Sequence, residues 1–240
     1  MRYLLLISGA SRGLGAALAE HAIAQGHAVL TFARSPCAHG EWVPLDLADP
    51  IKAEQSFAAA LARRGAESFD GYALVNNAAT IEPIGTAYGA AQAQAHLAVN
   101  LVAPIALSRV FLRELAERDA AKRIVNVSSG AAQRAFAGWS LYCAAKAGLD
   151  HFGRCVALEQ AQARFPVDVV NLSPGVIDTA MQARIRAASA DEFPSVARFI
   201  DLARSGQLAS PAAVARKLLA GIVGRRRYAG ATVAIDEFVG

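Results

Sequence analysis

Tyr142 and Lys146 stand four residues apart, and their side chains are the pair in this sequence best suited to chemistry. In a helix, residues at this spacing lie on one face, one turn from each other. A phenol has an ordinary pKa of about 10, and a nearby ammonium favours the phenolate and lowers that value. The pair therefore predicts a tyrosine that exchanges a proton with a substrate near neutral pH. The competing interpretation is a helix face that carries an aromatic ring and a lysine reaching towards solvent.

Two serines precede this pair, Ser128 and Ser129. Either hydroxyl would hold a carbonyl oxygen beside the phenol if the chain places it on a neighbouring loop. The spacing alone leaves open which of the two does so.

The N-terminal segment predicts a nucleotide-binding turn. Residues 2–7 form a short apolar run suited to a buried parallel strand, and Gly9, Gly13 and Gly15 follow it directly. Residues 16–25 then read as a helix. A strand, a glycine turn and a helix together point free backbone N–H groups and the positive end of the helix at a pyrophosphate. A turn with a purely structural role is the alternative.

Apolar runs alternate with helical stretches along the chain, which is typical of an α/β fold with a Rossmann-type, doubly wound, mostly parallel sheet of seven strands and helices on both faces. The expected strands lie near residues 2–8, 28–33, 42–45, 72–76, 123–128, 166–172 and 231–235, and the expected helices near 14–25, 50–64, 90–118, 140–163 and 210–223. Segment 177–208 is irregular, with short helical pieces, and is the expected substrate lid of a single domain spanning residues 1–240.

Polar and glycine residues follow the expected strands at the point where each strand ends. They are the glycine turn, Arg34, Asp46, Asn76 and Asn77, Ser128 and Ser129, and Pro174 and Gly175. Because ligands bind at the carboxyl ends of such strands, this edge of the sheet is the expected site.

Composition excludes several classes of protein. The chain has 240 residues, of which 54% are hydrophobic, and a net charge of only +4. The basic run Arg225–Arg227 is too short to indicate nucleic-acid binding. Cys37, Cys143 and Cys155 have no metal-ligand or redox spacing, which favours reduced thiols in a cytoplasmic protein. The apolar run at the N-terminus is too short for a signal peptide or a membrane span, so no membrane association is expected.

Taken together, these motifs resemble the short-chain dehydrogenase/reductase family over essentially the whole chain. The motifs occur in the family's order and approximate spacing: Gly9-x-x-x-Gly13-x-Gly15, Asn76-Asn77-Ala78-Ala79, Asn100, Ser129, Tyr142-x-x-x-Lys146 and Pro174-Gly175. Within the family, segments 138–144 and 173–182 resemble sepiapterin reductases, and segment 81–84 resembles reductases of benzil-type dicarbonyls.

The resemblance implies a role for each matching residue. Tyr142 would donate the proton, and Ser129, selected over Ser128 by the family's spacing, would stabilise the carbonyl oxygen. Lys146 would lower the pKa of Tyr142 and bind the nicotinamide ribose, and Asn100 would hold a water that links Lys146 to solvent. The implied cofactor-binding residues are Gly9, Ser11, Arg12, Gly13, Leu14, Gly15, Arg34, Asp46, Leu47, Asn77, Ala78, Tyr142, Lys146, Pro174, Gly175, Ile177 and Thr179. Of these, Asp46 would contact the adenine amine, and Ile177 and Thr179 the nicotinamide half.

Charge at the end of the second expected strand favours NADP(H) over NAD(H). An acid there would bind the adenosine 2′-hydroxyl and repel a 2′-phosphate, but residues 30–35 contain no acid. Arg34 stands at that position and Arg12 lies in the glycine turn. Guanidinium groups suit phosphate oxygens.

The expected substrate pocket combines aromatic, apolar and acidic side chains. Its candidates are Glu82, Phe136, Trp139 and Met181, and such walls favour a flat or hydrophobic ketone. His96 and His151 have no metal-like partners, so both are interpreted as ordinary helix residues and no metal site is expected.

The function expected is NADPH-dependent reduction of a ketone or vicinal dicarbonyl by a homodimer or homotetramer. The alternatives are a 3-oxoacyl reductase, an alcohol dehydrogenase of the same family, or a nucleotide-sensing regulator without catalysis. A regulator of this kind typically lacks the tyrosine or the lysine, and this chain has both.

Overall fold

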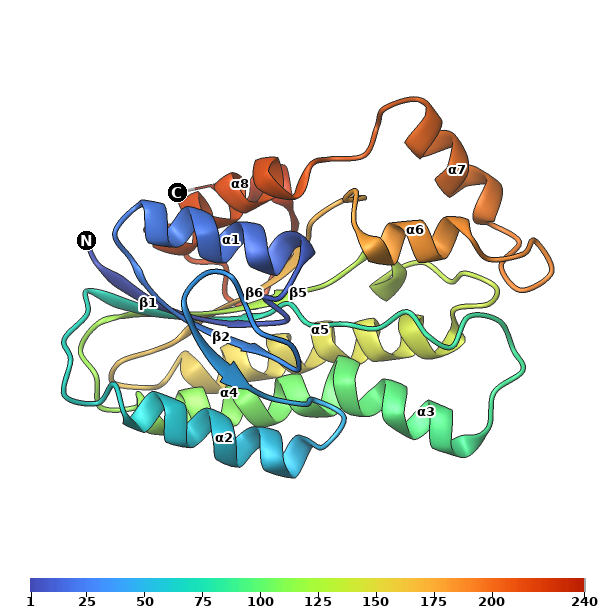
Figure 1. Ribbon diagram of the computed structural model, residues 1–240. Coiled ribbons are helices and arrows are strands. Elements are labelled where there is room, and N and C mark those ends of the chain that lie inside the picture. The colour runs from blue at the N-terminus through green and yellow to red at the C-terminus, as the bar shows by residue number, and fades with distance from the viewer. Residues whose placement is uncertain (240) are drawn as a thin grey trace.

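The computed structural model describes residues 1–239, and in this range it contains one sheet of seven parallel strands (Figure 1). The strand order is β3-β2-β1-β4-β5-β6-β7. The strands are β1 (Tyr3–Ser8), β2 (Ala28–Ala33), β3 (Glu41–Pro44), β4 (Gly71–Asn76), β5 (Ala121–Val127), β6 (Asp168–Ser173) and β7 (Thr232–Ala234). This is the doubly wound fold that the sequence predicts. The order reverses between β1 and β4, and ligands bind at such a reversal in this class of sheet.

Helices cover both faces of the sheet (Figure 1). They are α1 (Gly13–Ala24), α2 (Pro50–Ala62), α3 (Ala90–Leu97), α4 (Ala103–Glu114), α5 (Ser140–Gln160), α6 (Ala180–Arg186), α7 (Val196–Arg204) and α8 (Pro211–Val223). Helices α1 and α8 lie on one face, and α2, α4 and α5 on the other.

The central strands are buried on both sides because successive side chains point to opposite faces. In β1, Leu4 and Leu6 pack with Phe57 of α2 and Phe111 of α4. Leu5 and Ile7 of the same strand pack in the opposite core, which includes side chains of α1 and α8. Packing in the two cores fixes the positions of β1, β4 and β5, and hence of their carboxyl ends, relative to one another.

The apolar helix expected over residues 90–118 is interrupted. Residues Ala98–Val102 form a π-helical turn between α3 and α4, and the helix ends at Glu114. Such a turn inserts an extra residue and rotates the side chains that follow it. The stretch Ala90–Glu114 is long and apolar enough to cross a membrane by length and composition. Its inner face packs against α2 and α5, so it is a helix of the protein core.

Segment 177–208 contains two helices, α6 and α7, which lie beside the carboxyl ends of the strands (Figure 1). A bridge between Ile177 and Ala209 closes the segment at its base. A third cluster of buried apolar side chains, including Trp139, Phe193 and Phe199, joins both helices to the start of α5.

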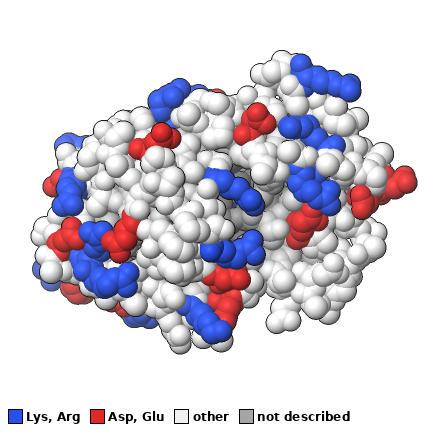
Figure 2. Space-filling model, viewed as in Figure 1, with Lys and Arg blue, Asp and Glu red and all other residues white. Residues whose placement is uncertain are grey.

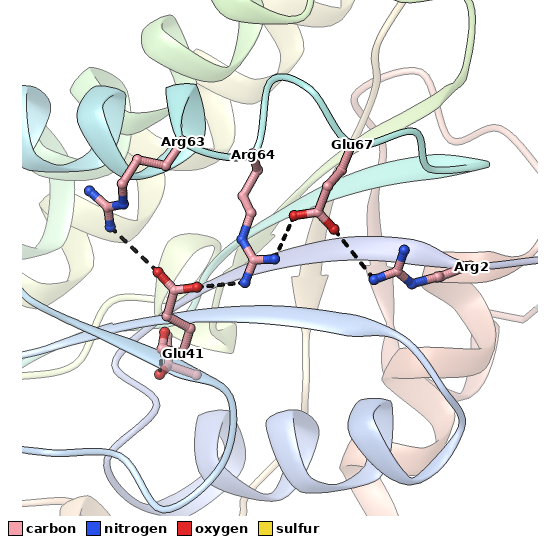
Figure 3. A network of polar contacts seen from close by, with 6 residues as sticks. Arg2, Glu41, Arg63, Arg64 and Glu67 are labelled. Carbon is pink, nitrogen blue, oxygen red and sulfur yellow. Dashed lines mark hydrogen bonds and ion pairs between the residues drawn. The ribbon is translucent and has the colours of Figure 1, made fainter.

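An ion-pair network lies at the amino ends of the strands, at the opposite end of the sheet from α6 and α7 (Figure 3). Glu41, at the start of β3, pairs with Arg63 and Arg64 beyond α2, and Glu67 pairs with Arg64 and Arg2. These side chains are partly exposed, so each pair contributes at most about 1 kcal/mol. The network lies at the amino ends of the strands, away from the motifs described above.

Candidate active site

The glycine turn after β1 packs tightly against the segment after β4. Gly9 has φ +71°, and a Cβ there would lie 2.7 Å from the Cα of Ala78. A Cβ on Gly15 would lie 2.5 Å from the carbonyl oxygen of Gly9. Asn77 holds this contact, because its Nδ2 donates to the carbonyl oxygens of Ser8 at 2.9 Å and Gly9 at 3.1 Å. Asn77 therefore positions the turn, and Gly15 allows α1 to approach it closely.

Helix α1 begins immediately after this turn, at Gly13 with φ +60°. The N-cap residue is Arg12, whose guanidinium can only donate, so its side chain leaves the N–H groups of the first turn uncapped. The first N–H groups of α1 therefore face the cavity with the positive end of the helix dipole. This arrangement suits the phosphates of a dinucleotide.

Tyr142, Lys146 and Ser129 come together at the carboxyl end of β5. Ser129 caps the short turn Gly130–Ala132, and its hydroxyl lies beside the Tyr142 phenol and lowers the pKa of that group. The Nζ of Lys146 lies 5.7 Å from the centre of the Tyr142 ring. Ser128 is buried, and its hydroxyl is directed towards Asp150. The geometry therefore places Ser129 beside the phenol and Ser128 behind it.

Burial, and not the lysine, dominates the pKa of Tyr142. Loss of solvent raises the pKa of the phenol to about 12, and the neighbouring Ser129 hydroxyl opposes this rise only in part. The sequence predicts that Lys146 lowers this pKa, but in the structure burial outweighs any such effect and the pKa of the phenol is raised. The physical reason is that the rings of Trp139 and His96, which pack edge-on against Tyr142, exclude water from the phenol. Burial of this kind disfavours the charged phenolate.

Lys146 is also buried, and its ammonium donates to the carbonyl oxygen of Val127 at 2.7 Å. Burial lowers the pKa of Lys146 to about 8, while Asp150, one turn further along α5, opposes the shift. Lys146 is therefore a cation at neutral pH and loses its charge in mildly alkaline solution.

Asn100 lies in the π-helical turn and is fully buried. Its Oδ1 accepts from the backbone N–H of Thr80 at 3.0 Å, and its Nδ2 donates to the carbonyl oxygen of Thr80 at 2.9 Å. The same Nδ2 lies 2.9 Å from Nε2 of His96. Asn100 thus holds the segment after β4 and does not itself line the cavity.

His96 belongs to the site, which the sequence reasoning missed. Its ring is buried, lines the cavity and meets the Tyr142 ring edge-on with 6.3 Å between centroids. The signal available in the sequence was its spacing of four residues before Asn100, the same spacing that joins Tyr142 to Lys146. His151 is exposed on α5 and lies outside the cavity, as expected of an ordinary helix residue.

A cavity of about 1380 Å³ runs from the glycine turn to Tyr142 and α6. All four residues expected in the substrate pocket line it, namely Glu82, Phe136, Trp139 and Met181. Nearly all the expected cofactor-binding residues line it too: Gly9, Ser11, Arg12, Gly13, Leu14, Arg34, Leu47, Asn77, Ala78, Tyr142, Lys146, Pro174, Gly175, Ile177 and Thr179. Gly15 and Asp46 do not line it. Gly15 is buried beneath the turn, whereas Asp46 is exposed, and one of its carboxylate oxygens accepts from Ala48 N–H at 3.0 Å.

Aromatic rings form the wall beyond Tyr142. Trp139 stacks on Phe193 with 4.3 Å between centroids and lies edge-on to Tyr142 at 5.7 Å. Phe136 and Phe199 pack against the same indole at 5.2 Å and 5.4 Å. Such a wall favours a flat, apolar substrate.

Basic side chains surround the cavity mouth, and Figure 2 shows Lys and Arg gathered around a hollow near the middle of this face. Arg12 and Arg34, at the end of the cavity beside the glycine turn, make no ion pair with any residue in the described range 1–239. At the end of the cavity beside α6, Arg184 pairs with Glu82 across the mouth. In the same described range, no group of three or more His, Cys, Asp or Glu side chains is placed to hold a metal.

The arrangement therefore combines a dinucleotide cradle, a buried phenol beside a serine hydroxyl and an adjacent lysine. A model of the short chain dehydrogenase family matches residues 4–190 of the sequence. The chain belongs to the short-chain dehydrogenase family. It is thus an oxidoreductase that acts on CH–OH or C=O groups with a nicotinamide cofactor.

Relatives within the family match nearly the full chain. Benzil reductase ((S)-benzoin forming) of Bacillus subtilis is 40% identical over 222 residues, covering 90% of this chain and 91% of the relative. Sepiapterin reductase of Rattus norvegicus is 29% identical over 238 residues, covering 89% and 88% of the two chains. These matches confirm the resemblance to sepiapterin and benzil reductases within the short-chain dehydrogenase family.

The fold of the short-chain dehydrogenase from Saccharomyces cerevisiae known as YIR035C is also similar. Its crystal structure superposes with a TM-score of 0.84, covering 99% of this chain and 100% of the yeast chain, at 22% identity. At this level of identity, the likeness concerns the fold alone.

Proposed function

We propose that this protein is an NADPH-dependent carbonyl reductase that acts on ketones or vicinal dicarbonyls, with Tyr142 as the proton donor. The observation that carries the proposal is the position of the buried Tyr142 phenol, which lines the cavity together with Ser129 and Lys146, with the Lys146 Nζ 5.7 Å from its ring centre. Burial raises the pKa of this phenol to about 12. A phenol with this pKa keeps its proton at neutral pH and is ready to give it to a developing alkoxide. Reduction needs this form, whereas oxidation of an alcohol needs a base.

Each polar group in the site has a distinct task. A bound nicotinamide cofactor supplies the hydride that adds to the carbonyl carbon. The Ser129 hydroxyl donates a hydrogen bond to the carbonyl oxygen and stabilises the negative charge that develops there. Tyr142 gives its phenolic proton to that oxygen. Lys146, with its ammonium beside the ring, stabilises the phenolate that remains.

Asn100 is proposed to support proton return to Tyr142. In the proposed relay, a water held near Thr80 and Asn100 links Lys146 to solvent. The two hydrogen bonds between the Asn100 amide and the Thr80 backbone support this role, because they hold the segment that borders the relay.

NADPH is the proposed cofactor because unpaired cations lie at the adenosine end of the cavity. Arg34 follows β2 directly and Arg12 lies in the glycine turn, and both side chains line the cavity. Their guanidinium groups would bind the 2′-phosphate. Leu47 would contact the adenine, with Asp46 facing its amine, and Ile177 and Thr179 would contact the nicotinamide half.

The substrate class is inferred from the aromatic wall together with the benzil reductase relatives. Trp139, Phe136 and Phe199 offer flat apolar surfaces next to the phenol. Benzil is a vicinal dicarbonyl with two aromatic rings, so it fits such a wall. The B. subtilis relative, named for benzil reduction, is 40% identical to this chain, which favours the same substrate class here.

The proposed setting is the cytoplasm, and the proposed assembly is a homodimer or homotetramer. The three cysteines are all free thiols, which suits a reducing compartment. Segment 177–208 is proposed as a lid, since α6 carries Met181 and Arg184 to the cavity mouth.

The test is nicotinamide oxidation by the purified protein, followed by absorbance with benzil, 1-phenyl-1,2-propanedione, sepiapterin and an acetoacetyl thioester. The proposal expects NADPH oxidation with the aromatic dicarbonyls and much slower oxidation of NADH. Turnover of the thioester alone, or of none of these compounds while NADPH still binds, would contradict it.

A further inference from the structure

The His96 ring is held at both nitrogens inside the site. Nδ1 lies 2.7 Å from the carbonyl oxygen of Glu82, and Nε2 lies 2.9 Å from Nδ2 of Asn100. The side chain is 1% exposed, and its ring edge meets Tyr142. A buried polar group with two partners of this kind has a defined hydrogen-bonding role.

The Asn100 amide can point only one way. Its Oδ1 faces a backbone N–H of Thr80, and its Nδ2 faces the carbonyl oxygen of the same residue. Reversing the amide would place donor against donor and acceptor against acceptor. Nδ2 is therefore the group that faces His96, and it can only donate.

The tautomer of His96 follows from this orientation. Since Asn100 donates to Nε2, that nitrogen carries no proton and accepts. Nδ1 then carries the proton and donates it to the Glu82 carbonyl oxygen, which can only accept. A second proton on the ring would set an N–H against the Asn100 amide.

The electrostatic surroundings agree with an uncharged ring. Burial lowers the pKa of His96, and the positive charge of Lys146 lowers it further, against the effect of the Glu82 carbonyl oxygen. The groups that face the ring are the Tyr142 phenol, Lys146, Asn100 and the Glu82 backbone. The Glu82 carboxylate is directed to Arg184 of α6.

We propose that His96 is a positioning residue of the reductase, which holds Asn100 and the Thr80–Glu82 segment in place through its Nδ1–H tautomer. The kinetic consequence rests on the proposed function. The hydrogen bonds join the catalytic end of the cavity to its mouth, because Glu82 is bonded through its backbone to His96 and through its carboxylate to Arg184. His96 acts through Asn100, and it touches neither hydride nor proton itself.

Two variants separate the two hydrogen bonds. In His96→Gln, the side-chain amide reaches as far as Nε2 and offers an acceptor to Asn100. In His96→Asn, the shorter amide reaches only as far as Nδ1 and offers a donor to Glu82. We expect His96→Asn to lower kcat about tenfold to a hundredfold with little change in KM, and His96→Gln to recover most of that loss. His151→Asn, on the exposed side of α5, is the matched control and keeps wild-type kinetics.

A double-mutant cycle tests whether the effect passes through Asn100. In an Asn100→Ala background, His96→Asn should lower kcat no further. An equal loss in both backgrounds would overturn the proposal, as would a wild-type kcat for His96→Asn. A His96→Asn protein with unchanged melting temperature and NADPH affinity excludes general unfolding as the cause.

The tautomer itself is tested without turnover. Imidazole ¹⁵N chemical shifts of histidine-labelled protein at pH 7 should show one ring, absent in His96→Gln, protonated at Nδ1 and unprotonated at Nε2. An Nε2–H or doubly protonated ring would overturn the proposal. If this ring is found but no carbonyl compound is reduced, the proposed function fails while the hydrogen-bond assignment stands.

Discussion

The ammonium of Lys146 lies 5.7 Å from the centre of the Tyr142 ring, and burial moves their pKa values in opposite directions. The pKa of the phenol rises to about 12 and that of the lysine falls to about 8. Both shifts favour the uncharged forms. At neutral pH the site therefore holds a protonated phenol next to a cation that is close to losing its proton.

The pH dependence of reduction should report Lys146. Because its pKa is lowered to about 8, the Lys146 amine is mostly charged below pH 8 and mostly neutral above it. We expect kcat/KM to be level below about pH 8 and to fall about tenfold per pH unit above it. Lys146→Arg removes this limb, because a guanidinium stays charged. A profile that stays level to pH 10 in the wild type would contradict the assignment.

Arg34→Ala should weaken NADPH binding and leave NADH binding nearly unchanged. A hydrogen-bonded charged pair contributes about 1.5–3 kcal/mol, so the Kd for NADPH should rise roughly tenfold to a hundredfold. Cofactor fluorescence titration measures both constants. Arg109→Ala, on the exposed face of α4, is the control for loss of positive charge. Equal weakening of NADPH and NADH would mean that Arg34 does not contact the 2′-phosphate.

Trp139→Leu should lower kcat/KM more for substrates that carry aromatic rings than for substrates without them. The indole stacks on Phe193 and lies edge-on to Tyr142, so it shapes the wall beside the phenol. We expect kcat/KM for benzil to fall about tenfold, since an aromatic contact is worth about 0.5–1.5 kcal/mol beyond the area it buries. Diacetyl, which has no ring, is the comparison substrate. A similar loss of kcat/KM for both compounds would mean that Trp139 only packs the protein and does not contact the substrate ring.

Two glycine substitutions separate backbone strain from close packing. Gly9 and Gly26 both have positive φ, but only Gly9 has an atom within 4 Å of an added Cβ. Gly26→Ala should lower the free energy of unfolding by about 1–2 kcal/mol through strain alone. Gly9→Ala should cost a further 1–3 kcal/mol or so and weaken cofactor binding, because the segment at Ala78 must move. Urea denaturation measures both; equal losses would show that the contact with Ala78 is unimportant.

The sequence was sufficient to predict the fold and the residues that gather at the carboxyl edge of the sheet. Parallel strands read as apolar runs, and the residue after each run is placed by the topology. Ser129, Tyr142 and Lys146 come together for this reason.

The features that the sequence could not supply depend on several elements at once. The pKa of Tyr142 is raised by water exclusion, which needs His96 from α3 and Trp139 beside α5 in addition to the helix that carries the pair. The role of His96 needs the π-helical turn at residues 98–102, which a smooth apolar pattern over residues 90–118 does not indicate. The local bond from Ala48 N–H to an Asp46 carboxylate oxygen likewise depends on the turn after β3.

The central claim is that Tyr142 gives the proton during carbonyl reduction. The most direct measurement is a single turnover of the preformed NADPH complex with benzil, comparing the wild-type protein with Tyr142→Phe. We expect the rate of NADPH oxidation to fall about a thousandfold in the variant, with an unchanged Kd for NADPH. A variant that retains a tenth or more of the wild-type rate would contradict the claim.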